Sequence, residues 1–278
     1  MSDRVTEKLA ALIRETSSSL PDDVERAIRS ALRREKGNSS ATVVLRTILD
    51  NVALARRASS PLCQDTGTLA FYVGGGLRRI VTPERIKAAV AAATADGALR
   101  KNCIDSIDGK SYDDNCAPGA PVIHYANDAD RTVTLIMKGG GSENMSRQYS
   151  LPDSSLNAGR DLEGVRKCIL DAVVKAQGYG CAPGILGVCI GGDRATAYET
   201  AKEQLLRNLD DSADDPRLAK LEKRILREAN SLGIGPMGLG GKTTLLGVKI
   251  AARPRVPASF FVTIAYMCWA CRRRSIVL

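Results

Sequence analysis

Apolar residues in the first 58 positions recur with the spacing of amphipathic helices. Leu9, Leu12 and Ile13 lie three to four positions apart, and similar spacing returns over residues 44–48. Side chains at this spacing share one face of an α-helix, so each run presents an apolar face for burial. Ser39-Ser40 offers an N-cap for the segment that follows it. We therefore expect residues 1–58 to form a helical N-terminal region.

Beyond the break at Ser59-Ser60-Pro61, short runs of β-branched and apolar residues are mixed with longer amphipathic segments. The pattern predicts strands over residues 69–73, 121–125, 132–137, 185–190, 245–251 and 260–267, the last two closing the chain. It predicts helices over residues 82–98, 162–176, 195–206 and 216–232, and an acidic surface loop over residues 209–216. Strands and helices lack the strict alternation of a doubly wound parallel sheet. The sequence thus predicts an α+β fold, with mixed sheets surrounded by helices, in a single domain over residues 1–278.

The composition limits the chemistry that the chain can carry. Hydrophobic residues make up 44% of the 278 residues and charged residues 26%, which excludes a wholly disordered chain. Eight cysteines contrast with one histidine, His124. A single histidine excludes zinc sites built on several histidines, including those of the HExxH proteases. Any metal chemistry must therefore depend on thiolates and carboxylates.

The ends and the apolar runs of the chain bear on its location. The N-terminal segment is rich in charged residues and lacks the apolar stretch of a secretory signal. The longest apolar run, over residues 258–271, is shorter than the roughly 18–20 residues that a membrane-spanning helix needs. We therefore expect a cytoplasmic protein with no membrane contact, in which the cysteines act as thiols or metal ligands and not as disulfides.

The net charge of +9 has two interpretations. A nucleic-acid binder gathers its basic residues on one surface and interleaves them with aromatic residues. Here aromatic residues make up 4%, the basic residues are scattered among acidic ones, and only Arg272-Arg273-Arg274 forms a run. We therefore expect no nucleic-acid partner, and interpret the charge as attraction for small anions or as a solvated face.

Three loops combine a cysteine with polar or loop-forming residues. Cys63 precedes Gln64-Asp65-Thr66, Cys181 lies in a Gly- and Pro-rich segment, and Cys268 follows an apolar strand. Three thiolates brought together by loops suit an iron–sulfur cluster better than zinc, because no histidine completes a zinc site. Two alternatives remain open: a capped loop around a buried cysteine, and half a zinc site or a redox pair at Cys268 and Cys271.

Ordered segments at these loops carry a resemblance to a known family. They are Cys63-Gln64-Asp65-Thr66-Gly67, residues 138–146, residues 232–244, and Cys268-Trp269-Ala270. At these segments the chain resembles the class I fumarate hydratases and the related L(+)-tartrate dehydratases, in their α subunit or N-terminal domain. The resemblance covers nearly the whole chain and implies the fold of that N-terminal domain.

The resemblance implies a cofactor and its ligands. By family pattern, Cys63, Cys181 and Cys268 hold three irons of a [4Fe–4S] cluster. The fourth iron lacks a cysteine and acts as a Lewis acid on the substrate's hydroxyl and carboxylate.

The resemblance also implies roles for polar residues near the first cysteine. Asp65 takes a proton-transfer or hydrogen-bonding role, and Gln64 and Thr66 hold substrate oxygens. Arg100 falls where the family places an arginine that binds a carboxylate, a task that suits its guanidinium fork. Gly140 offers a backbone N–H to the dianion. Each residue also has a purely structural alternative. Asp65 could cap a turn, Arg100 could be a cation at a helix end, and Gly140 could only permit a turn.

The chain departs from the family pattern at a position before the third cysteine. Where the family has a histidine, this chain has Val256, followed by Pro257-Ala258-Ser259. Valine transfers no proton, so a supporting acid–base group is missing. Residues 113–118 and Ala182-Pro183 also differ from the family's usual segments. His124 lies on an apolar strand, where we interpret it as a structural residue and not a base.

The motifs together predict the α subunit of an iron–sulfur hydro-lyase that reversibly hydrates fumarate to malate. L(+)-tartrate dehydration is the alternative within the class, and a catalytically impaired paralogue or a structural zinc protein is the alternative outside it. The chain ends soon after the third cysteine, so we expect a separate β subunit to complete the active site for a small dicarboxylate. Gly241-Lys242-Thr243 is not the end of a P-loop, because Pro236 stands where that motif needs glycine.

Overall fold

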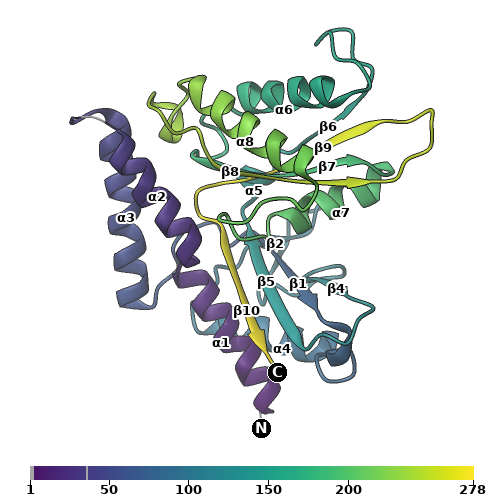
Figure 1. The fold of residues 1–278 in the computed structure, drawn as a ribbon. Helices are drawn as coiled ribbons and strands as arrows, with labels where there is room; N and C mark the ends of the chain where they lie inside the picture. Colours follow the sequence, from purple (N-terminus) through teal and green to yellow (C-terminus); the bar gives the residue numbers. More distant parts are fainter. Residues whose placement is uncertain (1–2, 36) are drawn as a thin grey trace. The chain divides into compact units, whose positions relative to one another are not determined.

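The computed structural model describes residues 3–35 and 37–278 (Figure 1). The chain gathers into two compact units. Unit 1 comprises the described residues up to Pro21 together with Asp50–Gly140 and Ala270–Leu278, and unit 2 comprises Asp22–Leu49 and Gly141–Trp269. The organisation of residues 1–278 as a single domain stays a prediction.

The described N-terminal residues form helices α1 (Arg4–Ser18), α2 (Asp22–Arg34) and α3 (Ser40–Ala58), which confirms the helical region. The carboxylate of Asp3 begins α1 by accepting the N–H groups of Val5 and Thr6 at 3.0 and 2.8 Å. Ser39 caps α3 in the same way, because its hydroxyl accepts the N–H of Thr42 at 3.3 Å. A capping oxygen satisfies backbone donors that the first helical turn leaves unpaired.

Unit 1 is built on a mixed four-stranded sheet. Its strands, in spatial order, are β10 (Arg272–Val277), β5 (Thr132–Lys138), β1 (Thr68–Val73) and β4 (Val122–Tyr125). Strand β1 pairs parallel to β4 and antiparallel to β5, and β5 pairs antiparallel to β10. Helices α1 and α4 (Pro83–Ala95) pack together, and their apolar faces form one core with the sheet. A short hairpin, β2 (Cys103–Ile104) and β3 (Ser111–Tyr112), lies outside this sheet.

Unit 2 is built on a second mixed four-stranded sheet. Its strands, in spatial order, are β6 (Arg147–Ser150), β9 (Phe261–Met267), β7 (Gly184–Gly191) and β8 (Leu245–Arg253). Helices α6 (Leu162–Ala176) and α8 (Pro216–Ser231) lie on one face of the sheet and α7 (Arg194–Gln204) on the other (Figure 1). Every residue of β7 is buried, as expected for a central strand covered on both faces.

The predicted strands and helices are confirmed, with boundaries shifted by a few residues, and so is the α+β class with mixed sheets. The prediction missed β10, β6, the β2–β3 hairpin and the short helix α5 (Gly140–Glu143). These elements are short or, in β10, begin with three arginines, so they lack the apolar periodicity that marks an element.

The arginine run at the start of β10 is largely buried. Arg272 and Arg273 are only 1% and 8% exposed, and each pairs with a residue of β5. A run of cations predicts a solvated segment because buried arginines are rare. Here tertiary pairing with β5 outweighs that preference.

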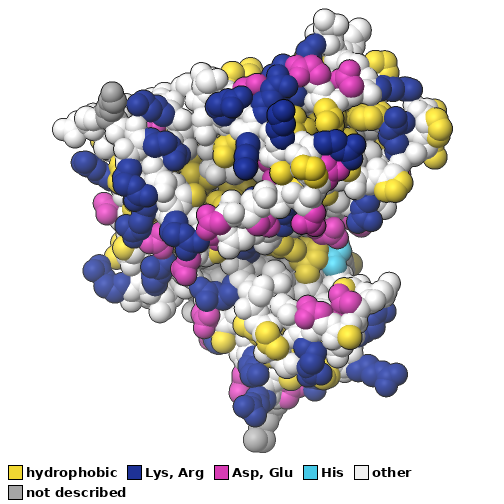
Figure 2. All heavy atoms as spheres, viewed as in Figure 1, with side chains coloured by type: hydrophobic (Ala, Val, Ile, Leu, Met, Phe, Trp, Pro, Cys, Tyr) yellow, Lys and Arg dark blue, Asp and Glu magenta, His cyan; other side chains and the backbone are white. Residues whose placement is uncertain are grey.

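The molecular surface mixes charges of both signs. On the face drawn in Figure 2, Lys and Arg side chains are spread among Asp and Glu side chains. Among the residues described, no helix combines the length and the apolar character needed to cross a membrane.

Candidate functional site

The loop from Cys63 to Gly67 connects α3 to β1 and is anchored inside unit 1. Leu62, which precedes it, is 4% exposed and donates its N–H to the carbonyl of Ser17 at 2.9 Å. The side-chain amide of Asn51 donates to the carbonyl of Leu62 at 2.9 Å. The Cys63 sulfur accepts the N–H of Asp65 at 3.4 Å. These contacts fix the start of the loop, and with it the position of the Cys63 thiol.

The structure brings Arg100 next to this loop. Thr66 is 3% exposed, and its hydroxyl accepts the backbone N–H of Arg100 at 2.9 Å. The Arg100 guanidinium donates to the carbonyl of Gln64 at 3.4 Å, and the side chain is otherwise exposed. The predicted residues Gln64, Thr66 and Arg100 are therefore neighbours, and Thr66 sets the position of the arginine.

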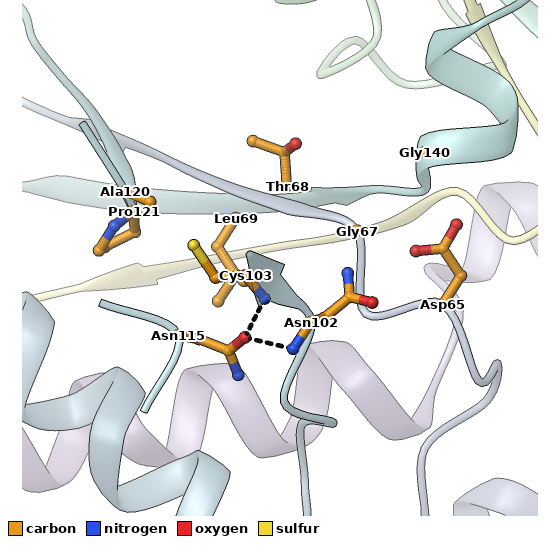
Figure 3. A pocket seen from close by; sticks show the side chains of 10 residues that line it. All are labelled: Asp65, Gly67, Thr68, Leu69, Asn102, Cys103, Asn115, Ala120, Pro121 and Gly140. Carbon is orange, nitrogen blue, oxygen red and sulfur yellow. Dashed lines mark hydrogen bonds between the residues drawn. The ribbon is translucent and has the colours of Figure 1, made fainter. Parts of the chain in front are cut away.

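A cavity of about 490 Å³ in unit 1 collects further predicted residues (Figure 3). This volume is in the range that holds small-molecule ligands. Asp65 and Gly140 lie at one end of the cavity (Figure 3). A Cβ atom on Gly139 would lie 2.9 Å from Oδ2 of Asp65, so glycine there leaves room for the carboxylate. The remaining lining residues are Gly67, Thr68, Leu69, Asn102, Cys103, Asn115, Ala120 and Pro121.

Asn115 organises the floor of this cavity, and the sequence did not single it out. Its side chain is 4% exposed and makes four hydrogen bonds. Oδ1 accepts the N–H groups of Asn102 and Cys103 at 2.8 and 3.0 Å (Figure 3). Nδ2 donates to Oγ1 of Thr94 at 3.0 Å and to the carbonyl of Arg100 at 2.8 Å. One buried amide thus positions residues 100–103, including the backbone of Arg100. The only feature of the sequence that could have pointed to Asn115 is that its segment, residues 113–118, departs from the family pattern.

Unit 2 brings the other two predicted ligands, Cys181 and Cys268, to one place. Trp269 donates its N–H to the carbonyl of Cys181 at 3.2 Å. Burial, followed by the nearby Cys268 and Cys181 thiols, raises the pKa of the Tyr266 hydroxyl. Both thiols therefore lie close to Tyr266. Cys181 is exposed and has a φ of 53°, a left-handed conformation that non-glycine residues adopt at functional sites more often than elsewhere.

Tyr266 fills the space beside Cys181 and has an unused polar atom. A Cβ on Gly184 would lie 2.5 Å from the Tyr266 hydroxyl oxygen, and a Cβ on Gly180 would lie 2.3 Å from its ring. Within the described residues the buried hydroxyl oxygen of Tyr266 has no hydrogen-bond partner. A buried polar group without a partner is costly.

The three predicted ligands all keep exposed surface, as do Cys103 and Cys116, whereas Cys168, Cys189 and Cys271 are buried. Cys63 and Cys268 are partly exposed and Cys181 is exposed. Burial raises the pKa of the Cys103 thiol, and raises those of Cys116, Cys168 and Cys189 to about 11, 12 and 11. Cys271 is 1% exposed. Because the thiolate is the form that binds metal, a raised pKa makes a cysteine a poorer ligand. The thiols of Cys63, Cys181 and Cys268 are accessible, and three thiolates are a donor set that fits an iron–sulfur cluster.

Neither unit by itself supplies three ligands of this kind. Cys63 belongs to unit 1, whereas Cys181 and Cys268 belong to unit 2. Over residues 3–35 and 37–278 no group of three or more His, Cys, Asp and Glu side chains forms a ready metal site. The assignment of the three cysteines as cluster ligands stays a prediction.

His124 and Val256 lie in different surroundings. The His124 ring is partly buried on β4 and stacks on the ring of Tyr72, with centroids 4.7 Å apart. This packing supports a structural interpretation of His124. Val256 is 64% exposed in the loop between β8 and β9. The Arg255 guanidinium donates to the carbonyls of Val256, Pro257 and Ser259 at 3.0–3.1 Å, which stabilises the loop around that position.

Comparison with known proteins places the chain in a family. Residues 6–277 match the family model described as fumarate hydratase (Fumerase). A Geobacillus stearothermophilus protein with the provisional name of class I fumarate hydratase is 50% identical over 278 residues, which is 98% of this chain and 54% of that protein. The chain thus spans about half of that relative.

Two shorter relatives are covered almost completely. A Methanocaldococcus jannaschii protein provisionally named L(+)-tartrate dehydratase subunit alpha is 34% identical over 97% of this chain and 96% of its own length. The L(+)-tartrate dehydratase subunit alpha of Escherichia coli is 30% identical over 99% of this chain and 91% of its own length. The motif segments and these matches agree, and the chain belongs to the fumarate hydratase (Fumerase) family of hydro-lyases.

Proposed function

We propose that this chain is the α subunit of a [4Fe–4S]-dependent hydro-lyase that reversibly hydrates fumarate to malate. The observation that carries the proposal is the cavity of unit 1, which gathers Asp65 and Gly140 at one end. Gln64 is the chain neighbour of Asp65, and Arg100 contacts Gln64 and Thr66 through hydrogen bonds. The 50% identity to a protein named as a fumarate hydratase supports fumarate as the first candidate substrate.

Cys63, Cys181 and Cys268 would hold the cluster, which when bound supplies a Lewis-acidic iron for the hydroxyl group that leaves as water. The other tasks belong to residues of the cavity. The Asp65 carboxylate faces the cavity next to Gly139, where it removes the proton from the carbon beside a substrate carboxylate and returns it in the reverse reaction. In dehydration, the proton taken by Asp65 and the hydroxide that leaves the substrate together make one water, and hydration returns both, so the reaction balances.

Arg100 and Gly140 would bind and orient the dianionic substrate. The exposed guanidinium of Arg100 can pair with a carboxylate through two parallel N–H groups. Its backbone is held by Thr66 and Asn115, so the head group starts from a fixed position. Such positioning lowers the entropy cost of bringing the reacting atoms together. Gln64, one residue before Asp65, has an exposed amide that would bind a substrate oxygen.

A β subunit would complete the site. Two relatives that this chain covers almost completely carry the name subunit alpha, and the Geobacillus relative is nearly twice as long as the match. We propose that the partner is a β subunit with further substrate-binding residues. The isolated α chain is then inactive. A cytoplasmic location, suited to thiols and an oxygen-sensitive cluster, belongs to the same proposal.

L(+)-tartrate dehydration is the second candidate. It is favoured by the named tartrate dehydratase alpha subunits, which match this chain over nearly their whole length. A catalytically impaired paralogue is the third, and Val256 favours it because the side chain transfers no proton.

The test is anaerobic purification of the chain together with its β subunit, followed by a visible spectrum and assays with fumarate and with L(+)-tartrate. We expect a brown protein that hydrates fumarate and bleaches in air. A brown protein that turns over only tartrate would favour the second candidate, and a brown protein without turnover would favour the third. A colourless protein that contains zinc would refute the cluster.

Matched serine variants distinguish the predicted cluster ligands from the remaining cysteines. Single replacement of Cys63, Cys181 or Cys268 by serine should remove the colour, whereas Cys103→Ser should keep it. Asp65→Asn should keep the colour and lower kcat by about 10²–10⁴-fold, the usual contribution of a general acid–base group. Retention of full kcat by Asp65→Asn would refute the proton-transfer role.

A further inference from the structure

Asn102 presents a free side-chain amide to the cavity of unit 1. The residue is exposed and lines the cavity, and its amide points toward Asp65 (Figure 3). Within the described residues this amide makes no hydrogen bond, whereas the amide of Asn115 makes four, all with the protein itself. A side-chain amide carries two N–H donors and an accepting oxygen. The cavity therefore contains donors that the protein leaves unused.

The backbone on both sides of this amide is held in place. The N–H groups of Asn102 and Cys103 both donate to Oδ1 of Asn115, at 2.8 and 3.0 Å. Asn115 is 4% exposed, so packing fixes the position of this acceptor. The Asn102 amide then moves only by rotation about its own side-chain bonds. A donor that is positioned in this way loses little entropy when it binds a ligand.

The charge of the cavity lining limits what can bind next to Asp65. Among the described residues, the lining contains this carboxylate and no Lys or Arg. The Arg100 guanidinium is not part of the lining, and donates to the carbonyl of Gln64. A substrate carboxylate beside Asp65 is repelled unless hydrogen-bond donors bind it. Of the other polar side chains drawn in Figure 3, that of Asn102 points toward Asp65, so its amide is placed to bind such a carboxylate.

We propose that the Asn102 amide donates to the substrate carboxylate attached to the carbon that Asp65 deprotonates. This inference deepens the proposed function and rests on it. When Asp65 takes the proton, the electron pair of the C–H bond moves toward that carboxylate, which transiently gains negative charge. The pair then forms the double bond as hydroxide leaves the neighbouring carbon, and hydration reverses each movement. Donors already in place where charge develops stabilise the transition state more than the bound substrate. Asn102 is therefore a catalytic residue that acts on kcat more than on KM.

The test uses the chain assembled anaerobically with its β subunit, as wild type, Asn102→Ala, Asn102→Asp and Ser111→Ala. Ser111→Ala is the matched control, because Ser111 is an exposed neutral residue of β3 that lines a neighbouring hollow and not this cavity. The readouts are kcat and KM for malate, and the isotope effect on kcat when malate carries deuterium on the carbon that loses its proton. We expect Asn102→Ala to lower kcat about 10²–10³-fold, the usual loss for one donor at a developing charge, with little change in KM. The isotope effect should increase, because proton removal then limits the rate. Ser111→Ala should match the wild type.

Asn102→Asp has nearly the shape of the wild-type side chain and covers the case in which Asn102→Ala does not fold. It replaces the donors by a second negative charge, so it should lower kcat at least as much. An unchanged kcat in either variant would refute the inference, and so would a raised KM at unchanged kcat, which would limit the amide to substrate binding. A lower kcat with an unchanged isotope effect, or an equal loss in Ser111→Ala, also counts against it. A wild-type assembly that neither hydrates fumarate nor dehydrates malate overturns the proposed function itself, whereas an active wild type with an unaffected Asn102→Ala overturns this inference alone.

Discussion

Replacing Asn115 by alanine tests whether one buried amide organises the floor of the cavity. The substitution removes four hydrogen bonds at 2.8–3.0 Å, two accepted from the N–H groups of residues 102 and 103 and two donated to Thr94 and Arg100. Asn115 also has a φ of 61°, a conformation that asparagine tolerates better than alanine.

The expected magnitude follows from these contacts. A typical internal hydrogen bond contributes about 1 kcal/mol net, and an unpaired buried partner costs at least that much. Four lost bonds then destabilise the fold by about 4 kcal/mol, a large share of the 5–15 kcal/mol that stabilises a typical domain. With an unfolding entropy of about 2.1 cal/mol/K per residue, this loss lowers the melting temperature of a 278-residue chain by roughly 7 °C.

Asn157→Ala is the control for the loss of stability that comes from placing alanine in a left-handed backbone conformation. Asn157 has a φ of 47° but an exposed side chain, and no hydrogen bond of that side chain occurs within the described residues. We expect Asn157→Ala to cost only about 1 kcal/mol. Urea unfolding of both variants and the wild type measures the difference. A loss for Asn115→Ala no larger than that for Asn157→Ala would show that the four hydrogen bonds do not support the cavity.

Further predictions concern unit 2. Gly184→Ala should destabilise the fold by about 1–3 kcal/mol, because its Cβ would meet the Tyr266 hydroxyl at 2.5 Å; an unchanged urea midpoint would contradict this. Tyr266→Phe should stabilise the cofactor-free chain by about 1 kcal/mol, since the hydroxyl lacks a partner there, and a loss measured in the same assay would argue against it. Although burial opposes its ionisation, hydrogen bonds from Arg207 and Lys249 lower the pKa of Asp211. Its contribution is present above the unfolded pKa of about 4 and is lost as pH falls through the lower folded pKa. Asp211→Asn should therefore cost about 2 kcal/mol at pH 7 and progressively less below pH 4; a pH-independent difference would contradict the pairing.

Local sequence was sufficient where an element carries its own signals. Thr82 followed by Pro83 predicts the start of α4, and the structure shows Thr82 as its N-cap, with the hydroxyl accepting the N–H of Arg85. The apolar spacing of α6 predicts bounds that the structure reproduces. In such segments the cap and the apolar face are read from residues three or four positions apart, and tertiary contacts only add burial.

Residues of the candidate site also differ in whether the local sequence identifies them. The segment from Cys63 to Gly67 is specific enough to indicate the family, and it singles out Asp65, which the structure places at the cavity of unit 1. Asn115 carries no comparable signal, because its four partners come from Thr94 and residues 100–103. No window along the chain shows that these groups converge on one amide.

The sequence by itself determined most of the helices and strands and the family, because these depend on periodicity, caps and ordered motifs. Only the tertiary structure decided whether the run Arg272-Arg273-Arg274 is buried or solvated. A segment of three cations reads as solvated, yet β10 pairs with β5 and buries Arg272 against the carbonyls of Asp65 and Thr66. Burial is a property of what packs around a side chain, and those groups lie more than 200 positions away in the sequence.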